Sequence, residues 1–207
     1  MTYLILIRHG DTIWTREKRY QGTTDVPLSP SGKKKFRDLA PIVRGFKPDV
    51  LYTSALTRCK ESGEIITRGT RLMPAEDARL NEIGFGRWEG KTAAELLEKK
   101  DPVYLKWAQG RWGVPPGGES LASLKNRVGQ FLNDCLKRHG GGKIVVVAHA
   151  GTIRMTLNVL LKFPLKYIFF FRLDPASVTI LRHDEDWTQA VCLNNTFFKK
   201  GWRPDGF

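Results

Sequence analysis

The sequence predicts an α/β fold with three layers, α/β/α, built on a mostly parallel central sheet with one antiparallel edge and a small helical lid insert. Two continuous apolar runs, Leu4 to Ile7 and Ile144 to Val147, have the pattern of strands buried on both faces. Between them lie segments with apolar residues at helical spacing. Because strands that alternate with helices favour one covered parallel sheet, we expect residues 1–207 to form a single domain.

The first half of the chain is predicted to hold three strands and two helices. The expected strands are Thr2 to Ile7, Asp49 to Thr53 and a short one at Arg71 to Pro74. A long polar loop runs from the first strand to Ser29, and Pro30 suits the first turn of the helix that follows. A second helix is expected near Leu56 to Thr67.

The second half begins with a turn-rich segment and a predicted lid insert at about 91–118. A charged helix over Thr92 to Lys100 should be interrupted by Pro102, and the glycines and prolines of 113–118 predict a loop. A long amphipathic helix follows over Glu119 to His139. Two strands close to each other in the sequence, Ser177 to Arg182 and Gln189 to Leu193, are expected to pair antiparallel at one edge.

Composition limits the classes of protein that this chain can belong to. The 34 Lys and Arg against 21 Asp and Glu give a net charge of +13, which attracts anions. Small phosphorylated substrates and nucleic acid are candidate partners for such a charge, and a solvated basic surface without a partner is the third possibility. No nucleic-acid-binding motif is present in the sequence, so no nucleic acid is expected as a partner. Three cysteines without CxxC spacing argue against disulfides and a zinc site. No apolar run is long enough to span a bilayer, so no membrane and a cytoplasmic location are expected.

Charged side chains follow the ends of several predicted strands. Arg8 and His9 come directly after the first strand, Arg58 lies at the start of the helix after the second, and His149 follows the valine-rich strand. Ligands of open α/β sheets bind at the carboxyl ends of strands, so these residues can converge on one small anion. Phosphoryl transfer needs cationic donors, a nucleophile and an acid. If Arg8 and His9 are considered without the other residues, the alternative to a binding site is a strand whose polar end simply reaches the surface.

Five motifs in order resemble those of the histidine phosphatase superfamily, the phosphoglycerate mutase-like proteins. They cover Leu4 to about Arg154, nearly three quarters of the chain. The motifs are Leu6-Ile7-Arg8-His9-Gly10-Asp11-Thr12, Tyr52-Thr53-Ser54-Ala55-Leu56-Thr57-Arg58, Leu80-Asn81-Glu82-Ile83-Gly84-Phe85-Gly86-Arg87-Trp88-Glu89-Gly90, Pro116-Gly117-Gly118-Glu119-Ser120 and Val147-Ala148-His149-Ala150-Gly151. The wording of the Glu82 segment is similar to that of α-ribazole phosphatases and related small-molecule phosphatases.

The resemblance implies catalytic roles for five residues. His9 is implied as the nucleophile, Arg8, Arg58 and His149 as ligands of the transferring phosphoryl group, and Glu82 as the proton donor. Apolar neighbours of Glu82 favour a partly desolvated carboxyl with a raised pKa. Glu89 is the competing carboxylate, and a structural role in the next turn is the interpretation we prefer for it.

The resemblance also implies a set of substrate-binding residues, and neither a metal nor a cofactor. Gln21 and Gly22 lie on the loop expected to flank the phosphate. Thr15 departs from the family pattern, in which asparagine is frequent at that position. Thr152 has two interpretations, a contact to the phosphate or a cap of the following helix.

These observations predict a phosphomonoesterase acting on small phosphorylated metabolites through a phosphohistidine, similar to α-ribazole phosphatases. A metal-independent phosphoserine phosphatase and a phosphoglycerate mutase are the alternatives, with a scaffold protein that carries a dead site behind them. Tyr104, Trp107 and Trp112 are expected either to shape a lid over the substrate or to pack on the surface or at a subunit contact. The tail 197–203 could cover the pocket mouth, and a homodimer is left open.

Overall fold

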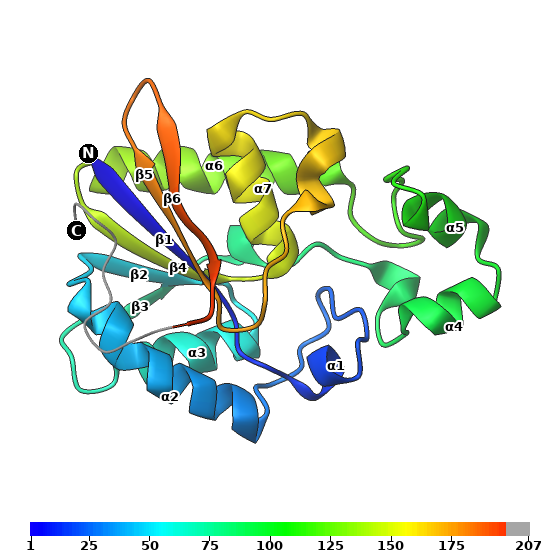
Figure 1. Cartoon of the computed structure of the whole chain (residues 1–207), viewed down its shortest axis with the longest axis horizontal. Helices are drawn as coiled ribbons and strands as arrows, with labels where there is room; N and C mark the ends of the chain where they lie inside the picture. The colour runs from blue at the N-terminus through cyan, green and yellow to red at the C-terminus, as the bar shows by residue number, and fades with distance from the viewer. Residues whose placement is uncertain (198–207) are drawn as a thin grey trace.

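The computed structural model describes residues 1–197, and within them six strands form one sheet in the order β3-β2-β4-β1-β5-β6 (Figure 1). The strands are β1 Thr2–Arg8, β2 Val50–Thr53, β3 Pro74–Glu76, β4 Lys143–Ala148, β5 Val178–His183 and β6 Thr188–Asn195. β1, β2, β3 and β4 pair in parallel, whereas β5 is antiparallel to β1 and β6 is antiparallel to β5. The predicted mostly parallel sheet with an antiparallel edge is confirmed.

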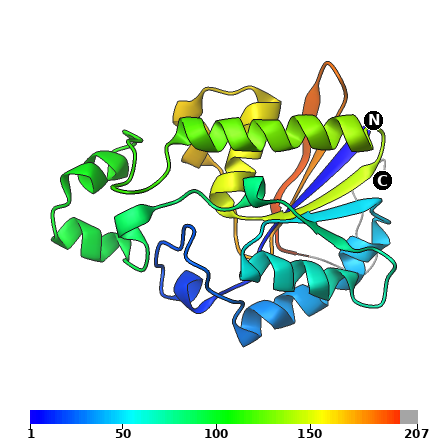
Figure 2. The same cartoon turned by 180° about the vertical axis from the view of Figure 1, so that it is seen from behind.

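Helices cover both faces of this sheet, as Figures 1 and 2 show. The α-helices are α1 Ile13–Arg16, α2 Pro30–Gly45, α3 Thr57–Thr67, α4 Ala93–Glu98, α5 Pro102–Ala108, α6 Leu121–His139 and α7 Ala150–Leu161. Three 3₁₀ helices are η1 Ala78–Leu80, η2 Gly86–Trp88 and η3 Leu165–Phe170. α2 and α3 lie on one side of the sheet, and α6 and α7 lie on the other.

Alternation along the two central strands produces the two halves of the core. Leu4 and Leu6 of β1 pack with the apolar side of α6, whereas Ile5 and Ile7 pack with Phe36 and its neighbours on α2. Successive side chains of a strand point to opposite faces, so an uninterrupted apolar run is needed where both faces are covered. All four β1 residues are at most 1% exposed. The sheet therefore delivers the polar ends of β1 and β4 to one fixed edge.

Two local expectations were wrong. The third strand lies at Pro74–Glu76, a few residues after the predicted position, where Pro74 starts an edge strand and its missing N–H removes no central ladder bond. The loop after β1 contains α1, which is capped by reciprocal bonds between Thr12 and Thr15. The interruption expected at Pro102 is observed, since α4 ends at Glu98. Pro102 also begins a new helix, because the Asp101 carboxylate accepts from the amides of Val103 and Tyr104.

The segment predicted as a lid insert contains α4 and α5, which project away from the sheet on the same side as α1 (Figures 1 and 2). Leu96, Tyr104 and Trp107 of this segment form a separate apolar cluster with Trp88 of η2. Within the described residues no helix combines the length and the apolar character needed to cross a membrane.

Candidate active site

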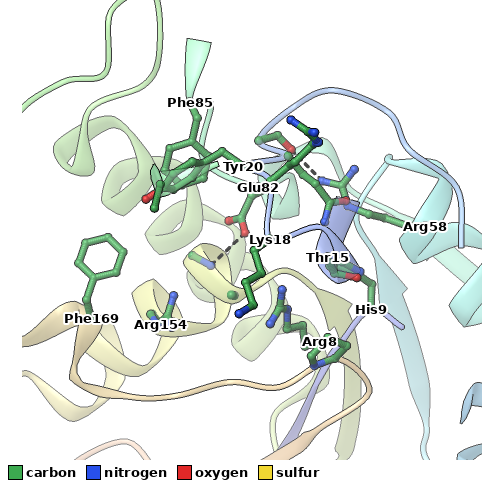
Figure 3. A pocket seen from close by; sticks show the side chains of 17 residues that line it. Arg8, His9, Thr15, Lys18, Tyr20, Arg58, Glu82, Phe85, Arg154 and Phe169 are labelled. Atoms are coloured by element: carbon green, nitrogen blue, oxygen red, sulfur yellow. Dashed lines mark hydrogen bonds between the residues drawn. The ribbon is translucent and has the colours of Figure 1, made fainter. Parts of the chain in front are cut away.

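A pocket of about 370 Å³ lies at the carboxyl end of β1, and Figure 3 shows the side chains that line it. Its walls come from distant parts of the chain: the end of β1, residues 15 and 18–22 around α1, the start of α3, the loop before η2, the start of α7 and the segment after it. Arg8, His9, Arg58 and Glu82 all line this pocket, as do Thr15, Gln21 and Gly22. The structure thus brings seven of the nine predicted site residues into one cavity.

His9 is held as a neutral imidazole with one ring nitrogen fixed. The ring is 3% exposed, and its Nδ1 lies 2.8 Å from the carbonyl oxygen of Gly10. Because a carbonyl can only accept, Nδ1 carries the proton and Nε2 keeps a free lone pair. Burial, followed by the charges of Arg58 and Arg8, holds the pKa of His9 well below its ordinary value. The imidazole is therefore unprotonated and nucleophilic at neutral pH.

Arg8 presents an unused hydrogen-bond donor. Its Nη1 donates to the carbonyl oxygen of Leu173 at 2.6 Å, whereas its Nε is buried and has no partner among the described residues. Burial lowers the pKa of Arg8 to about 10, so the guanidinium is still protonated at neutral pH. A buried donor without an acceptor is costly in a folded protein. An anion in the pocket would supply the missing acceptor.

Arg58 is fully buried behind the loop that carries Gly22. Its Nη2 donates to the Gly22 carbonyl at 2.7 Å, its Nη1 to the Thr24 carbonyl at 2.9 Å, and its Nε to Nδ1 of His149 at 3.2 Å. Three bonds fix the plane of the guanidinium, and its charge contributes to the low pKa of both histidines. A fixed cation of this kind needs little reorganisation when an anion arrives.

His149 does not line the pocket and lies behind His9, with ring centroids 5.1 Å apart. It is fully buried, and its Nε2 lies 2.7 Å from the hydroxyl oxygen of Ser54. Both ring nitrogens therefore face protein groups, Arg58 on one side and Ser54 on the other. Direct contact with a phosphoryl group would require one of these bonds to be exchanged, so the expected role of His149 as a ligand stays a prediction.

Glu82 lies on the pocket wall with its carboxylate anchored by main-chain donors. One oxygen accepts from the amide of Ile83 at 3.0 Å, and the other accepts from the amide of Gly151, at the start of α7, at 3.2 Å. The loop that carries it is held from outside by Arg127, whose guanidinium donates to the carbonyl oxygens of Arg79, Asn81 and Glu82. The carboxylate is thus half-buried and fixed at the edge of the cavity.

Glu89, the competing carboxylate, has a structural position. It accepts hydrogen bonds from the backbone amides of Thr23, Thr24 and Phe85 and does not line the pocket of His9. Burial alone would raise the pKa of Glu89, but these bonds hold it below its ordinary value. Gly22 has a φ of +54°, and a Cβ there would overlap the Glu89 carboxylate. The loop conformation therefore requires glycine at this position.

Both predicted substrate-binding threonines use their hydroxyl groups in bonds to the main chain. Thr152 was expected to contact the phosphate or to cap α7. Its hydroxyl does not cap the helix but donates to the carbonyl oxygen of Asn81 at 2.8 Å, and the contact to the phosphate stays a prediction. Thr15 lines the pocket, but its hydroxyl accepts from the amide and donates to the carbonyl of Thr12. Gln21 lines the pocket with a buried side-chain oxygen that has no partner among the described residues.

Several residues of the pocket wall are not among the site residues predicted from the sequence. Lys18 and Arg154 bring further positive charge, and Tyr20, Phe85 and Phe169 bring aromatic rings. Arg154 lies on the helix that starts beside His149, so its distance from that motif could have indicated it. No local pattern marks Lys18, which follows α1 with a φ of +57°, or Phe169, which lies in η3 far along the chain.

The aromatic residues of the insert do not line the pocket but pack behind its wall. The hydroxyl of Tyr104 lies 2.9 Å from that of Tyr20, and the rings of Trp107 and Trp112 have centroids 5.5 Å and 4.3 Å from that of Phe169. A lid over the substrate and packing on the surface or at a subunit contact were both left open for Tyr104, Trp107 and Trp112, and in the structure these residues support the wall from behind. The tail predicted to cover the mouth falls, beyond residue 197, outside the described residues.

Histidines outside the pocket have ordinary partners. His139 lies in the last turn of α6, as expected, and its Nε2 is 2.9 Å from the hydroxyl of Tyr52. His183 pairs with the hydroxyl of Thr188 across the β5–β6 hairpin. Within residues 1–197 no group of three or more His, Cys, Asp and Glu side chains is arranged to hold a metal ion.

Comparison with known proteins identifies relatives along almost the whole chain. The family model of the histidine phosphatase superfamily (branch 1) matches residues 4–196. Phosphoserine phosphatase 1 of Hydrogenobacter thermophilus is 35% identical over 197 residues, which cover 95% of this chain and 93% of the relative. The crystal structure of a putative α-ribazole-5′-P phosphatase from Escherichia coli is similar with a TM-score of 0.86 and 25% identity, covering 94% of this chain and 97% of that one. A mutant phosphoserine phosphatase from Entamoeba histolytica in complex with phosphoserine is similar with a TM-score of 0.82 and 31% identity, and the match covers 95% of this chain and 98% of that one.

Proposed function

The chain belongs to the histidine phosphatase superfamily, and from that premise we propose that it hydrolyses small phosphomonoesters through a phosphohistidine formed on His9. The observation that carries the proposal is the environment of His9. Its Nδ1 donates to the Gly10 carbonyl, its Nε2 is free, and burial together with the charges of two arginines lowers the pKa of the ring and keeps it neutral. A neutral imidazole with a fixed tautomer is the form that can attack phosphorus.

In the first proposed step, Nε2 of His9 forms a bond to phosphorus while the ester P–O bond breaks. The guanidinium groups of Arg8 and Arg58 stabilise the negative charge on the equatorial oxygens. The unpartnered Nε of Arg8 supports a direct contact to one of those oxygens. Glu82 donates its proton to the departing alkoxide, which leaves as an alcohol.

In the second proposed step, water attacks the phosphohistidine. Glu82, now a carboxylate, takes a proton from that water as the new P–O bond forms and the P–N bond breaks. Inorganic phosphate is released, and His9 returns to its neutral form. The two main-chain amides that hold the Glu82 carboxylate support this role, because they fix its position while it changes protonation state.

Two small phosphomonoesters are the substrate candidates, α-ribazole phosphate and phosphoserine. Both classes occur among the names of similar proteins. They differ in the body of the molecule, because only phosphoserine carries a carboxylate. A cytoplasmic site of action is part of the proposal and is supported by the three cysteines, which are all free, as expected for a reducing compartment.

The test is phosphate release from p-nitrophenyl phosphate, phosphoserine, α-ribazole phosphate and 3-phosphoglycerate in the presence of EDTA. We expect release by the wild-type protein and its loss in His9→Ala, whereas His183→Ala, a histidine outside the pocket, serves as the matched control and keeps the activity. Undiminished turnover by His9→Ala would remove the nucleophile. Isomerisation of 3-phosphoglycerate faster than its hydrolysis would indicate a mutase instead.

A further inference from the structure

Lys18 and Arg154 place two more positive charges in the pocket than phosphoryl binding needs. Both line the same cavity as His9, and Figure 3 shows both side chains pointing into it. They come from opposite parts of the wall, since Lys18 follows α1 and Arg154 lies on α7. The backbone of Lys18 is left-handed, with a φ of +57°.

The other cations of the pocket already have partners. Arg19 is paired with Glu17 and Glu95, whereas Arg8 and Arg58 donate to main-chain carbonyls and are assigned to the phosphoryl group by the proposed function. Like those two arginines, Lys18 and Arg154 have no ion pair to any residue in 1–197, and the proposed phosphoryl transfer gives them no anion to bind.

Arg154 is also pre-positioned. Its Nε donates to the carbonyl oxygen of Phe171 at 2.8 Å, and its guanidinium lies 5.5 Å from the centroid of the Phe169 ring. These contacts fix the plane of the group, while its two terminal nitrogens form no hydrogen bond to the described residues. An arginine fork with both ends free is suited to a planar group with two oxygens.

The acidic groups of the pocket do not balance this charge. Among the described lining residues Glu82 is the sole carboxylate, and main-chain amides already occupy both of its oxygens. Burial lowers the pKa of Arg154, and the nearby charge of Glu82 offsets this effect only in part. A second anion on the ligand would relieve that cost.

We propose that Lys18 and Arg154 bind a carboxylate on the body of the substrate, so that the preferred substrate is a short phosphomonoester that also carries a carboxylate. The inference rests on the proposed function and narrows its substrate class. A cavity of about 370 Å³ is at the small end for ligand sites, which favours a body of only a few atoms between the two anionic groups. Phosphoserine fits this description, and α-ribazole phosphate does not.

The experiment compares substrates that differ only in the carboxylate. One pair is phosphoserine and O-phosphoethanolamine, and the other is 3-phosphoglycerate and glycerol 3-phosphate. For the wild-type protein we expect kcat/KM to be about ten- to a hundredfold higher for the carboxylate member of each pair, which is the gain expected from the equivalent of one charge-assisted hydrogen bond. Lys18→Met should remove most of this ratio, and Arg154→Met should remove it as well.

Lys162→Met is the matched control for the first variant, because Lys162 is also exposed and left-handed at the end of a helix but lies outside the pocket. It should keep the wild-type ratio. Arg154→Met also loses the bond to Phe171, so the ratio between paired substrates is the readout, since a structural defect lowers both members equally. The exposed Lys18 gives an independent variant that has little effect on folding.

Equal kcat/KM within both pairs for the wild-type protein, or an unchanged ratio in Lys18→Met, would overturn the inference while the proposed phosphatase stands. Fructose 1,6-bisphosphate and fructose 6-phosphate differ by a second phosphate. If kcat/KM favours the bisphosphate by the same factor as it favours the carboxylate member of each pair, the site binds any second anion and the carboxylate assignment is overturned. Absence of hydrolysis of every substrate, p-nitrophenyl phosphate included, would instead overturn the proposed function itself.

Discussion

Replacing Arg127 by methionine should damage catalysis from outside the pocket. Arg127, on α6, donates to the carbonyl oxygens of Arg79, Asn81 and Glu82 at 2.7, 2.6 and 3.1 Å, and it forms a two-bond ion pair with Glu119 at 2.8 Å. The loop that carries the proposed proton donor is therefore held by one guanidinium. Methionine keeps the length and helix propensity of the side chain but donates none of these bonds.

The magnitude follows from the burial of the pair. Breaking a fully buried ion pair costs about 3–5 kcal/mol, and the side chains of Arg127 and Glu119 are 20% and 19% exposed, so we discount the loss to about 2–3 kcal/mol. For a chain of this length that loss lowers Tm by about 5–10 °C. A shift of the Glu82 carboxylate by about 1 Å would reduce kcat up to about a hundredfold.

The assay separates the proton donor from general damage by comparing leaving groups. An alkyl phosphate such as phosphoserine needs a proton on its departing oxygen, whereas p-nitrophenolate leaves as a stable anion. The burst of p-nitrophenol reports the first step alone, so in Arg127→Met it should slow far less than the first step with phosphoserine. Lys125→Met, an exposed cation on the same helix, is the control and should match the wild-type protein.

An equal slowing of both first steps would refute this reasoning, because the loss would then not act through Glu82. Unchanged Tm in Arg127→Met would refute the stability part, because it would show that water replaces the guanidinium at the three carbonyl oxygens. Glu82→Gln provides the reference, since it should show the same dependence on the leaving group without the loss of stability.

Two further predictions concern stability. Gly22→Ala should lower the free energy of unfolding by about 3 kcal/mol, because φ is left-handed there and the new Cβ would overlap the Glu89 carboxylate. Gly69 is also left-handed but has open space around it, so Gly69→Ala should lower that free energy by only about 1 kcal/mol. Equal losses in urea titrations would contradict the role of the overlap. Burial and the charge of Arg58 hold the pKa of both His9 and His149 well below the ordinary value, so the unfolded chain binds protons that the folded chain does not. The free energy of unfolding should therefore fall as pH drops below about 6.5, by about 1.4 kcal/mol per pH unit for each histidine. In His9→Gln this free energy should depend less steeply on pH. An unchanged pH dependence would argue against a lowered pKa of His9.

The sequence predicted the framework of the fold because burial leaves a strong pattern. β1 and β4 are covered on both faces, so their continuous apolar runs stand out, and the residues that follow them had to lie at one edge of the sheet. Short elements left no such pattern. The four residues of α1 cannot show helical periodicity, and Pro102, which usually interrupts a helix, here begins one because Asp101 caps it.

The sequence predicted those site residues that belong to motifs. It did not predict the residues whose position or bonding depends on tertiary packing. Thr152 resembled a ligand in the sequence, but the Asn81 carbonyl takes its hydroxyl. Lys18 lies at the pocket because its backbone is left-handed, and no glycine or asparagine at this position indicates that conformation in the sequence. Phe169 becomes part of the wall because Trp107 and Trp112 support it, a contact between segments far apart in the chain.

The most direct test of the central claim is to trap the intermediate. The protein would be mixed with phosphoserine, quenched in alkali within milliseconds, digested and examined by mass spectrometry. We expect one phosphoryl group on a ring nitrogen of His9 in the peptide that contains it, formed within a single turnover and absent in His9→Ala. A phosphoryl group on any other residue, or phosphate release at full rate with His9 unmodified throughout, would contradict the account.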